Sequence, residues 1–467
     1  PDYYSVKTVE LTQQNLSLLL QSSVLNLRGN LTYQPTSDER GGFLLWNGEV
    51  FDGLEILNEN DTSIISRNLA ACTDIQEILN VLASIRGPWA FIYYSKILNT
   101  IYFGRDVLGR RSLLWHIPKS ETDAFVLTSV TEKPVVFNET CVWQEVPANG
   151  VYYINFTNVT WDPVKRRVFP LPAKFSRVAI LFSGGVDSMM IAAHATAHIP
   201  SNEPIDLINV AFTLDSESFH YINIYCSGVI LLLVDINNSN VPDRVTGRKG
   251  VQELAALYPE RTWNFIEVDV TLTELYLHKE HIKTLCTPLS SVMDLSIASA
   301  LWFASRGIGK LRRYTSDILS TSENYETPAR ILLVGIGADE QLGGYRKHRM
   351  VFHKGGWEAL AEELQRGIQA ISYRNLGRDD RVIGDHGREA RFPFLDEDLV
   401  NFLSSVPVWL KADLRYPRGL GEKYLLRKAA WKVGMKNSAF MEKRAIQFGS
   451  RVAHLEKFMG KKLKNLL

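Results

Sequence analysis

A serine- and glycine-rich turn, SGGVDS at residues 183–188, separates an apolar run typical of a strand from one typical of a helix. Backbone N–H groups at a helix start, together with the helix dipole, attract an anion. Gly184 and Gly185 have no Cβ to hold the backbone away from a phosphate. Ser183 and Ser188 add hydroxyl donors. The pattern predicts a phosphate-binding loop, and the alternative is a capped helix behind a buried strand.

The loop also carries a carboxylate, Asp187, and is not of the Gly-x-x-x-x-Gly-Lys type. A carboxylate beside phosphates is costly unless a cation lies between them, so we expect Asp187 to bind Mg²⁺. A second stretch, ILLVGIGADEQLGGY at 331–345, again leads from a strand into glycines and acids. If both strands share one parallel sheet, their carboxyl ends share a crevice, and Asp339 can hold the same metal. The alternative is that Asp339 and Glu340 cap the next helix.

Two patterns of secondary structure divide the chain near residue 169. Before it, strand-like runs such as FLLWNGEVFDG (43–53) flank a helical pattern at 73–85, which predicts an α+β domain. From residue 178, short apolar strands alternate with helices, which is typical of a doubly wound parallel sheet, and the last third is helical. Residues 226–244 fit neither pattern and are interpreted as a divergent insertion, with a poorly ordered loop as the alternative.

The composition argues against several classes of function. The 467 residues carry 52 Lys and Arg against 51 Asp and Glu, so binding of nucleic acid by bulk charge is not expected. The apolar run near 229–234 is too short to span a bilayer, and the first residues show no signal peptide. The four cysteines form no CxxC pair, so neither zinc nor a disulfide framework is indicated. We expect a cytoplasmic protein with no nucleic-acid or membrane partner.

In combination, several motifs resemble those of the asparagine synthetase family. They are SGGVDS, GADEQLGGY at 337–345 and EARFPFLD at 389–396, with NGEVF at 47–51 and the stretch 87–116 similar to the family's N-terminal half. The resemblance covers nearly the whole chain. It implies that residues 1–168 form a type-2 glutamine amidotransferase domain, an Ntn-type αββα sandwich. Residues 169–467 would form an asparagine synthetase domain with a doubly wound parallel sheet and a helical C-terminal part.

The resemblance also implies roles for single residues. In the first domain, the Asn47 side chain and the Gly48 N–H would form the oxyanion hole, which suits donors aimed at a developing negative charge. Glutamine would be bound by Arg28, Glu49 and Asp61, although Arg28 or Asp61 alone could equally be a solvated surface charge. In the second domain, ATP would contact Leu181, Ser183, Gly184, Gly185, Asp187, Ser188 and Gly335, with Mg²⁺ on Asp187 and Asp339.

The sequence departs from the family at several positions. The family's nucleophile is an N-terminal cysteine, whereas this sequence begins Pro1-Asp2, which resembles the end of a downstream RGPD motif. We therefore expect that residues preceding Pro1 are absent and that these 467 residues hydrolyse no glutamine. Ile336 replaces a catalytic glutamate, and Ala445 replaces an active-site lysine, with Lys443 and Arg444 as neighbouring cations. The aspartate-binding segment at 290–306 is poorly matched.

The sequence thus predicts an ATP- and Mg²⁺-dependent amidotransferase. Its expected substrates are glutamine, ATP and an acidic acceptor such as aspartate, and whether it forms a homodimer stays open. ATP would adenylate the acceptor carboxylate, and ammonia from glutamine would displace AMP. Two alternatives remain: an enzyme that adenylates another small acid or a tRNA base, and a nucleotide-binding pseudoenzyme that serves as a scaffold. Ile336 and Ala445 favour the scaffold.

Overall fold

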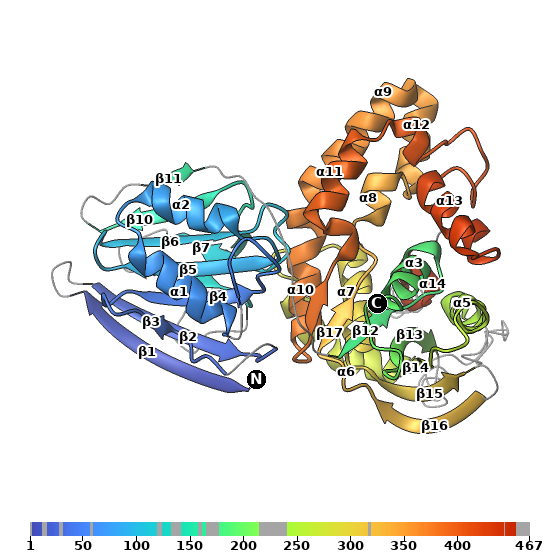
Figure 1. The fold of residues 1–467 in the computed structure, drawn as a ribbon, viewed down its shortest axis with the longest axis horizontal. Helices are drawn as coiled ribbons and strands as arrows, with labels where there is room; N and C mark the ends of the chain where they lie inside the picture. Colours follow the sequence, from blue (N-terminus) through green and yellow to red (C-terminus); the bar gives the residue numbers. More distant parts are fainter. Residues whose placement is uncertain are drawn as a thin grey trace, which may run out of the picture. The chain divides into compact units, whose positions relative to one another are not determined.

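The computed structural model describes residues 2–11, 16–27, 31–56, 59–118, 124–131, 142–156, 161–164, 177–213, 241–315, 319–442 and 444–453. The chain separates into two compact units (Figure 1). Unit 1 comprises Pro1–Ser176 and Ala370–Arg381, and unit 2 comprises Arg177–Gln369 and Val382–Leu467. The predicted boundary at 168/169 lies outside the described residues. So does most of the predicted insertion at 226–244, although its last residues begin helix α5.

Unit 1 is built on a six-stranded antiparallel sheet with the order β11-β10-β6-β5-β4-β3. The strands are β3 (Thr36–Ser37), β4 (Phe43–Gly48), β5 (Trp89–Ser95), β6 (Thr100–Arg105), β10 (Val151–Asn155) and β11 (Trp161–Val164). Helices α1 (Asp61–Ala71) and α2 (Ile75–Ser84) pack on one face, where Trp46, Trp89 and Phe91 belong to their buried cluster. Asn60 caps α1 and Asp74 caps α2, each accepting a backbone N–H.

A small sheet packs on the other face of the six-stranded sheet. Side chains alternate along each strand, so every second residue of the six-stranded sheet points toward it. It consists of β8 (Val126–Thr128), β7 (Leu114–His116) and β9 (Gln144–Glu145), and its neighbours Leu113 and Val146 share a core with Phe103 and Tyr94. A separate hairpin joins β1 (Tyr3–Leu11) and β2 (Leu16–Val24). The mixed α and β character agrees with the prediction, whereas the four-layer αββα description stays a prediction.

Residues Ala370–Arg381 belong to unit 1 although they follow it far along the chain. They cover η3 (Ser372–Leu376) and the start of α10 (Gly377–Gly384). Arg381 Nη1 lies 2.7 Å from Glu145 Oε1, and Arg111 Nη1 lies 3.1 Å from Asp380 Oδ1. Both arginine side chains are buried, so separating either ion pair would leave an uncompensated charge.

Unit 2 contains a seven-stranded sheet with the order β16-β15-β14-β13-β12-β17-β18. The strands are β12 (Val178–Leu181), β13 (Ile205–Thr213), β14 (Trp263–Thr271), β15 (Ile308–Tyr314), β16 (Leu319–Glu326), β17 (Ile331–Leu333) and β18 (Glu389–Arg391). The strands from β14 to β18 in this order run parallel, as predicted, and β15 and β16 add an antiparallel edge that was not predicted. The order along the chain reverses between β12 and β17, and such a switch point is where open parallel sheets bind ligands.

Helices cover both faces of this sheet. α3 (Val186–Ala195) and α5 (Pro242–Leu257) share a core with Leu207 and Phe265. Phe212, on the opposite face of β13, contacts Phe303 with ring centroids 5.8 Å apart. The remaining elements are α6 (Leu272–Cys286), α7 (Val292–Ser305), α8 (Ala338–Leu342), α9 (Arg346–Ile371), η4 (Pro393–Leu395), α11 (Glu397–Ser405), α12 (Val408–Lys411), α13 (Tyr424–Val433), η5 (Ser438–Phe440) and α14 (Ile446–Gly449).

Two further predictions concern membranes and cysteines. Within the described part of the chain, no helix combines the length and hydrophobicity needed to cross a bilayer. Cys72 and Cys286 are buried free thiols, whereas Cys141 and Cys226 lie outside the described residues.

Candidate nucleotide-binding site

Two loops meet at the switch point, where β12 and β17 end. Residues 183–185 connect β12 to α3, and residues 334–337 connect β17 to α8. Gly335 lies against the first loop, because a Cβ on it would come within 3.1 Å of the Asp187 Cβ. Both stretches that the sequence analysis singled out therefore lie at one edge of the sheet.

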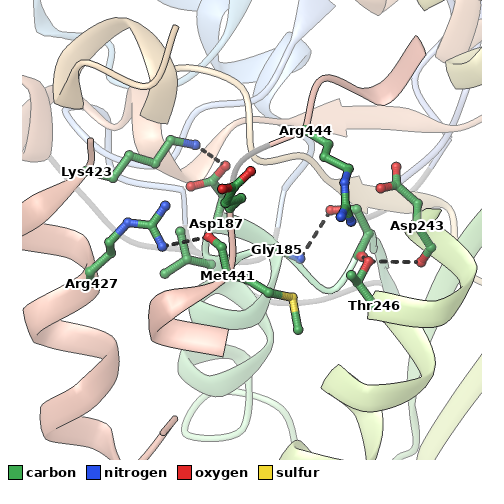
Figure 2. Close-up of a pocket in the computed structure, with 11 residues that line it drawn as sticks. Gly185, Asp187, Asp243, Thr246, Lys423, Arg427, Met441 and Arg444 are labelled. Carbon is green, nitrogen blue, oxygen red and sulfur yellow. Dashed lines mark hydrogen bonds and ion pairs between the residues drawn. The ribbon is translucent and has the colours of Figure 1, made fainter. Parts of the chain in front are cut away.

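At the centre of the site is Lys423, which the sequence analysis did not single out. Its Nζ lies 2.5 Å from Asp187 Oδ2 (Figure 2). The same Nζ lies 2.8 Å from Asp339 Oδ1, and the Lys423 side chain is fully buried. Burial alone would lower the pKa of Lys423, but the two carboxylates reverse this and hold its pKa above its usual range. The two predicted metal-binding carboxylates thus converge on one cation, an ammonium that stays charged.

The backbone of Lys423 adopts an unusual conformation to reach this position. Its φ of 55° and ψ of 33° are left-handed, which costs a residue with a side chain roughly 1–2 kcal/mol. Its N–H donates to the carbonyl of Leu342 at 2.8 Å, which ties the start of α13 to the end of α8. Nothing in the sequence distinguishes Lys423 from Lys428 and Lys432, so only the fold reveals it.

The predicted phosphate loop, residues 183–185, is closely packed against its neighbours. Gly184 has a φ of 77°, and a Cβ there would lie 2.3 Å from the Thr246 carbonyl oxygen, so α5 occupies the space beside it. A Cβ on Gly185 would lie 3.3 Å from Ser183 Oγ, and apart from its chain neighbours no other described residue would be in contact with it. Ser188 Oγ donates to the Gly185 carbonyl at 3.1 Å. The lack of a side chain at Gly184 therefore allows α5 to pack closely, whereas the lack of one at Gly185 leaves space in the pocket.

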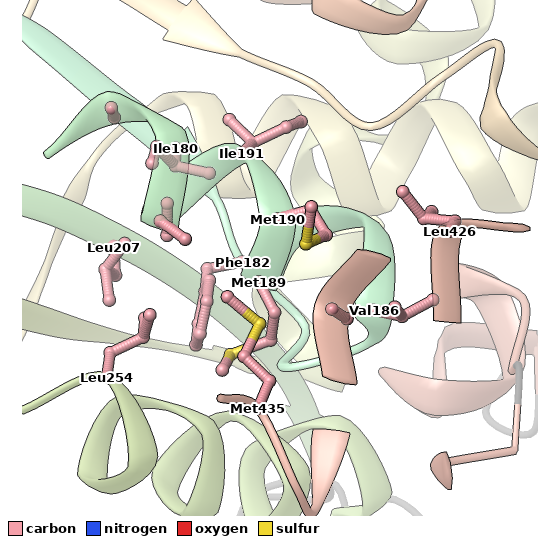
Figure 3. Packing of buried hydrophobic residues seen from close by; sticks show 14 of the residues in the cluster. Ile180, Phe182, Val186, Met189, Met190, Ile191, Leu207, Leu254, Leu426 and Met435 are labelled. Atoms are coloured by element: carbon pink, nitrogen blue, oxygen red, sulfur yellow. The ribbon is translucent and has the colours of Figure 1, made fainter. Parts of the chain in front are cut away.

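A buried core fixes the helix that begins at this loop. Val186, Met189 and Met190 of α3 pack in one cluster with Phe182, Leu254 and Met435, which come from three other segments (Figure 3). Each buried side chain of this size contributes about 1.5–3 kcal/mol through burial. The N-terminus of α3 consequently has a fixed position relative to β12.

A pocket opens at the predicted phosphate loop. It is lined by Ser183, Gly185, Val186, Asp187, Asp243, Thr246, Lys423, Arg427, Met441, Glu442 and Arg444 (Figure 2). Thr246 Oγ1 donates to the Ser183 carbonyl at 2.7 Å, which binds α5 to the loop. The sequence analysis missed Asp243, Thr246 and Arg427. Asp243 lay in the segment interpreted as an insertion, and none of the three belongs to a recognisable pattern.

The two acidic residues in the first turn of α8, Asp339 and Glu340, make different interactions. Glu340 is buried, accepts the Gly337 N–H at 3.2 Å and the Tyr345 hydroxyl at 2.6 Å, and burial raises its pKa. Helix capping, the alternative considered for both acids, therefore describes Glu340, whereas Asp339 pairs with Lys423. A Cβ on Gly344 would lie 1.7 Å from Asp339 Oδ1, so this glycine makes room for the pair.

The residues predicted to form the oxyanion hole and to bind glutamine belong to unit 1. Asn47 and Gly48 end β4, and Glu49 follows with its N–H donating to the Pro88 carbonyl at 2.9 Å. Asp61 is buried and accepts the Val50 N–H at 3.1 Å, so it is not a solvated surface charge. Arg28 lies outside the described residues.

Comparisons with known proteins identify the family. A family model described as asparagine synthase matches residues 352–467. The human asparagine synthetase domain-containing protein 1 is 38% identical across 97% of this chain and 90% of its own length. The chain belongs to the family of asparagine synthetase domain-containing proteins. The family resemblance predicted from the motifs is therefore confirmed.

More distant similarities extend beyond this family. A putative glutamine-hydrolysing asparagine synthetase of Methanocaldococcus jannaschii is 23% identical across 90% of this chain and 75% of its own length. A solved glutamine phosphoribosylpyrophosphate amidotransferase from B. subtilis, complexed with ADP and GMP, is 17% identical with a TM-score of 0.22. That match covers 35% of this chain and 34% of the solved chain. This score is too low to establish a common fold.

The two positions that depart from the asparagine synthetase motifs, Ile336 and Ala445, are not among the residues that line the pocket. Ile336 is half-buried in the turn between β17 and α8, and Ala445 directly precedes α14. Arg444 lines the pocket, and Lys443 lies outside the described residues. The poorly matched segment at 290–306 contains α7, and its Arg306 pairs with Glu274.

The donor set can be tested for its fit to Mg²⁺. In the described ranges, no group of three or more His, Cys, Asp or Glu side chains is arranged to hold a metal. Mg²⁺ in nucleotide sites is commonly held by one or two carboxylates together with phosphate oxygens and water. Asp187 and Asp339 converge closely enough to share one ammonium, so the pair fits such a site when phosphate completes it.

A buried histidine next to this loop makes the stability of unit 2 depend on pH. His348 in α9 is fully buried, its Nδ1 accepts the Tyr345 N–H at 3.2 Å, and burial lowers its pKa to about 4. Between pH 6.5 and 4, the unfolded chain binds a proton that the folded chain does not, so acid destabilises the fold.

We expect His348 to account for about 2 kcal/mol of lost stability between pH 7 and pH 5, or roughly 4–8 °C in Tm. His348→Gln keeps an acceptor for the Tyr345 N–H and does not titrate. Thermal unfolding of both proteins across this range measures the difference. Identical slopes of Tm against pH would contradict the assignment.

Proposed function

We propose that the chain is an ATP-dependent ligase that adenylates a carboxylate, with aspartate as the expected acceptor, and amidates it with ammonia derived from glutamine. The observation that carries this proposal is the convergence of Asp187 and Asp339, from two separate loops, on Lys423 at the strand switch point. Family membership and the similarity to a putative glutamine-hydrolysing asparagine synthetase support it. A cytoplasmic location is part of the proposal.

Each part of the pocket has a proposed role. The backbone of residues 183–185 and the N-terminus of α3 bind ATP phosphates, and Leu181 and Gly335 flank them. Asp187 and Asp339 hold Mg²⁺, which when bound neutralises phosphate charge. Lys423 keeps the two carboxylates together before the nucleotide arrives, which reduces the reorganisation needed on binding. In unit 1, Asn47 and Gly48 supply the oxyanion donors, and Arg28, Glu49 and Asp61 hold glutamine.

A second candidate is a nucleotide-binding scaffold without turnover. Ile336 and Ala445 favour it, since neither side chain carries a charge or exchanges a proton, whereas the family's motifs have a glutamate and a lysine at these positions. Both candidates require ATP binding, and only the ligase requires AMP formation. Detection of AMP and pyrophosphate from ATP across candidate acids separates them.

Replacing Asp187 by asparagine tests the nucleotide site itself. We expect ATP with Mg²⁺ to bind at least tenfold more weakly, because one of two metal-binding carboxylates is lost, and charged interactions of this kind contribute about 1.5–3 kcal/mol. Without Mg²⁺, the affinity should change little. Isothermal titration with and without Mg²⁺ measures both. Asp294→Asn, at a partly exposed position at the start of α7, is the matched control, and equal affinities in all three proteins would refute the metal assignment.

A further inference from the structure

Three basic side chains line the pocket at the phosphate loop, and two of them are occupied by protein partners. Lys423 binds Asp187 and Asp339. Arg427 donates to the carbonyls of Ala439 and Met441 at 2.9 and 2.8 Å. It also pairs with Glu422 at 3.2 Å. Arg444, the third, has no hydrogen bond or ion pair with any residue that the structure describes.

The charge balance of the pocket depends on this third side chain. The acidic side chains that line it are those of Asp187, Asp243 and Glu442, and the basic ones other than Arg444 are Lys423 and Arg427. Without Arg444, the lining would have three acidic and two basic side chains, and its net negative charge would repel an entering anion. A guanidinium there makes the lining neutral and leaves one cation available to a ligand.

The position of Arg444 suits contact with an anion at the loop. In the view of Figure 2, Lys423 and Arg444 stand on opposite sides of Asp187 and Gly185. Arg427 anchors the carbonyl of Met441, three residues before Arg444, so the segment that carries Arg444 is tied to α13. The Arg444 side chain is exposed, so its charge stays hydrated when no ligand is bound.

We propose that Arg444 binds the phosphate oxygens of a di- or triphosphate held at the loop. This inference rests on the proposed nucleotide site and names the side chain that recognises the anion. A guanidinium keeps its charge at every physiological pH and presents parallel N–H donors that match two phosphate oxygens. Arg444 therefore replaces bulk water as the partner of the phosphates on the side of the loop away from Lys423.

The experiment compares ATP, inorganic pyrophosphate and adenosine as ligands, each with Mg²⁺, by isothermal titration. Arg444→Ala should weaken ATP and pyrophosphate by at least tenfold and leave adenosine unchanged, since charge-assisted hydrogen bonds contribute about 1.5–3 kcal/mol. Arg444→Lys should fall between, because it keeps the charge and loses the two-pronged geometry. Arg366→Ala is the matched control, since Arg366 is exposed on α9 and pairs with Glu362 and Glu363, away from the residues that line the pocket.

The outcomes separate this inference from the proposed function. If the unsubstituted protein binds ATP and pyrophosphate and Arg444→Ala binds them equally well, the role of Arg444 is refuted and the nucleotide site stands. If the unsubstituted protein binds neither, both fail. If only ATP weakens, Arg444 contacts another part of the nucleotide and the phosphate assignment is wrong. The melting temperature of Arg444→Ala should equal that of the unsubstituted protein, because no described residue partners Arg444.

Discussion

Replacing Lys423 by methionine will lower the melting temperature steeply in the absence of Mg²⁺, and Mg²⁺ will restore much of the loss. The substitution keeps the length of the side chain and removes the charge that holds Asp187 and Asp339 together. The lysine side chain is fully buried and the two acids are largely shielded, at 22% and 17% exposure. Removing one partner of a buried ion pair costs about 3–5 kcal/mol, which corresponds to roughly 5–15 °C here.

The response to Mg²⁺ distinguishes a metal site from a purely structural ion pair. In Lys423→Met, two facing carboxylates without a cation should recruit Mg²⁺, and binding to the folded state alone raises its stability. The unsubstituted protein should respond less, because Lys423 already offsets part of the charge of the two acids. Adding Asp187→Asn to Lys423→Met should remove both the repulsion and most of the Mg²⁺ response. A Lys423→Met protein that melts like the unsubstituted one, or ignores Mg²⁺, would contradict the shared-cation description.

Asparagine formation from aspartate, ATP and free ammonia will be very slow, well below the roughly 1 s⁻¹ typical of enzymes, yet above a blank without enzyme. Free ammonia makes the assay independent of glutamine hydrolysis, so it reports on unit 2 alone. Ile336 and Ala445 carry no charge, so they cannot stabilise the negative charge that the proposed adenylation and amide formation would develop. Removing one such electrostatic contribution commonly lowers the rate by about 10²–10³, and two acting together need not add.

Quantifying asparagine and AMP under saturating substrates decides between the two candidate functions. A rate on the order of 1 s⁻¹ or more is typical of enzymes and would show that a neighbouring cation such as Arg444 compensates, which excludes the scaffold. Background rates together with measurable ATP binding would favour the scaffold. In that case, Ile336→Glu combined with Ala445→Lys is the informative variant, and Arg366→Ala is its control for unrelated surface changes.

Local chemistry explains why the sequence located both loops of the site. The apolar runs before Ser183 and Gly335 are short and bounded by glycine, serine and acids, and such patterns depend on neighbours along the chain. They identified β12, α3 and β17 and brought Asp187 and Asp339 into one hypothesis. β17 nevertheless ends at Leu333, before the predicted strand run is complete, because the turn toward Gly337 begins there.

Tertiary structure alone decided which other residues reach the pocket. Lys423 is 236 residues from Asp187 along the chain, and its role depends on burial and a left-handed backbone rather than on a motif. Asp243 and Thr246 line the pocket because α5 packs against Gly184. Such a contact between segments far apart in the chain produces no periodic pattern in the sequence. Residues Ala370–Arg381 join unit 1 through buried ion pairs for the same reason. Sequence patterns thus determined the two loops of the candidate site, whereas long-range packing determined the charged residues that surround them.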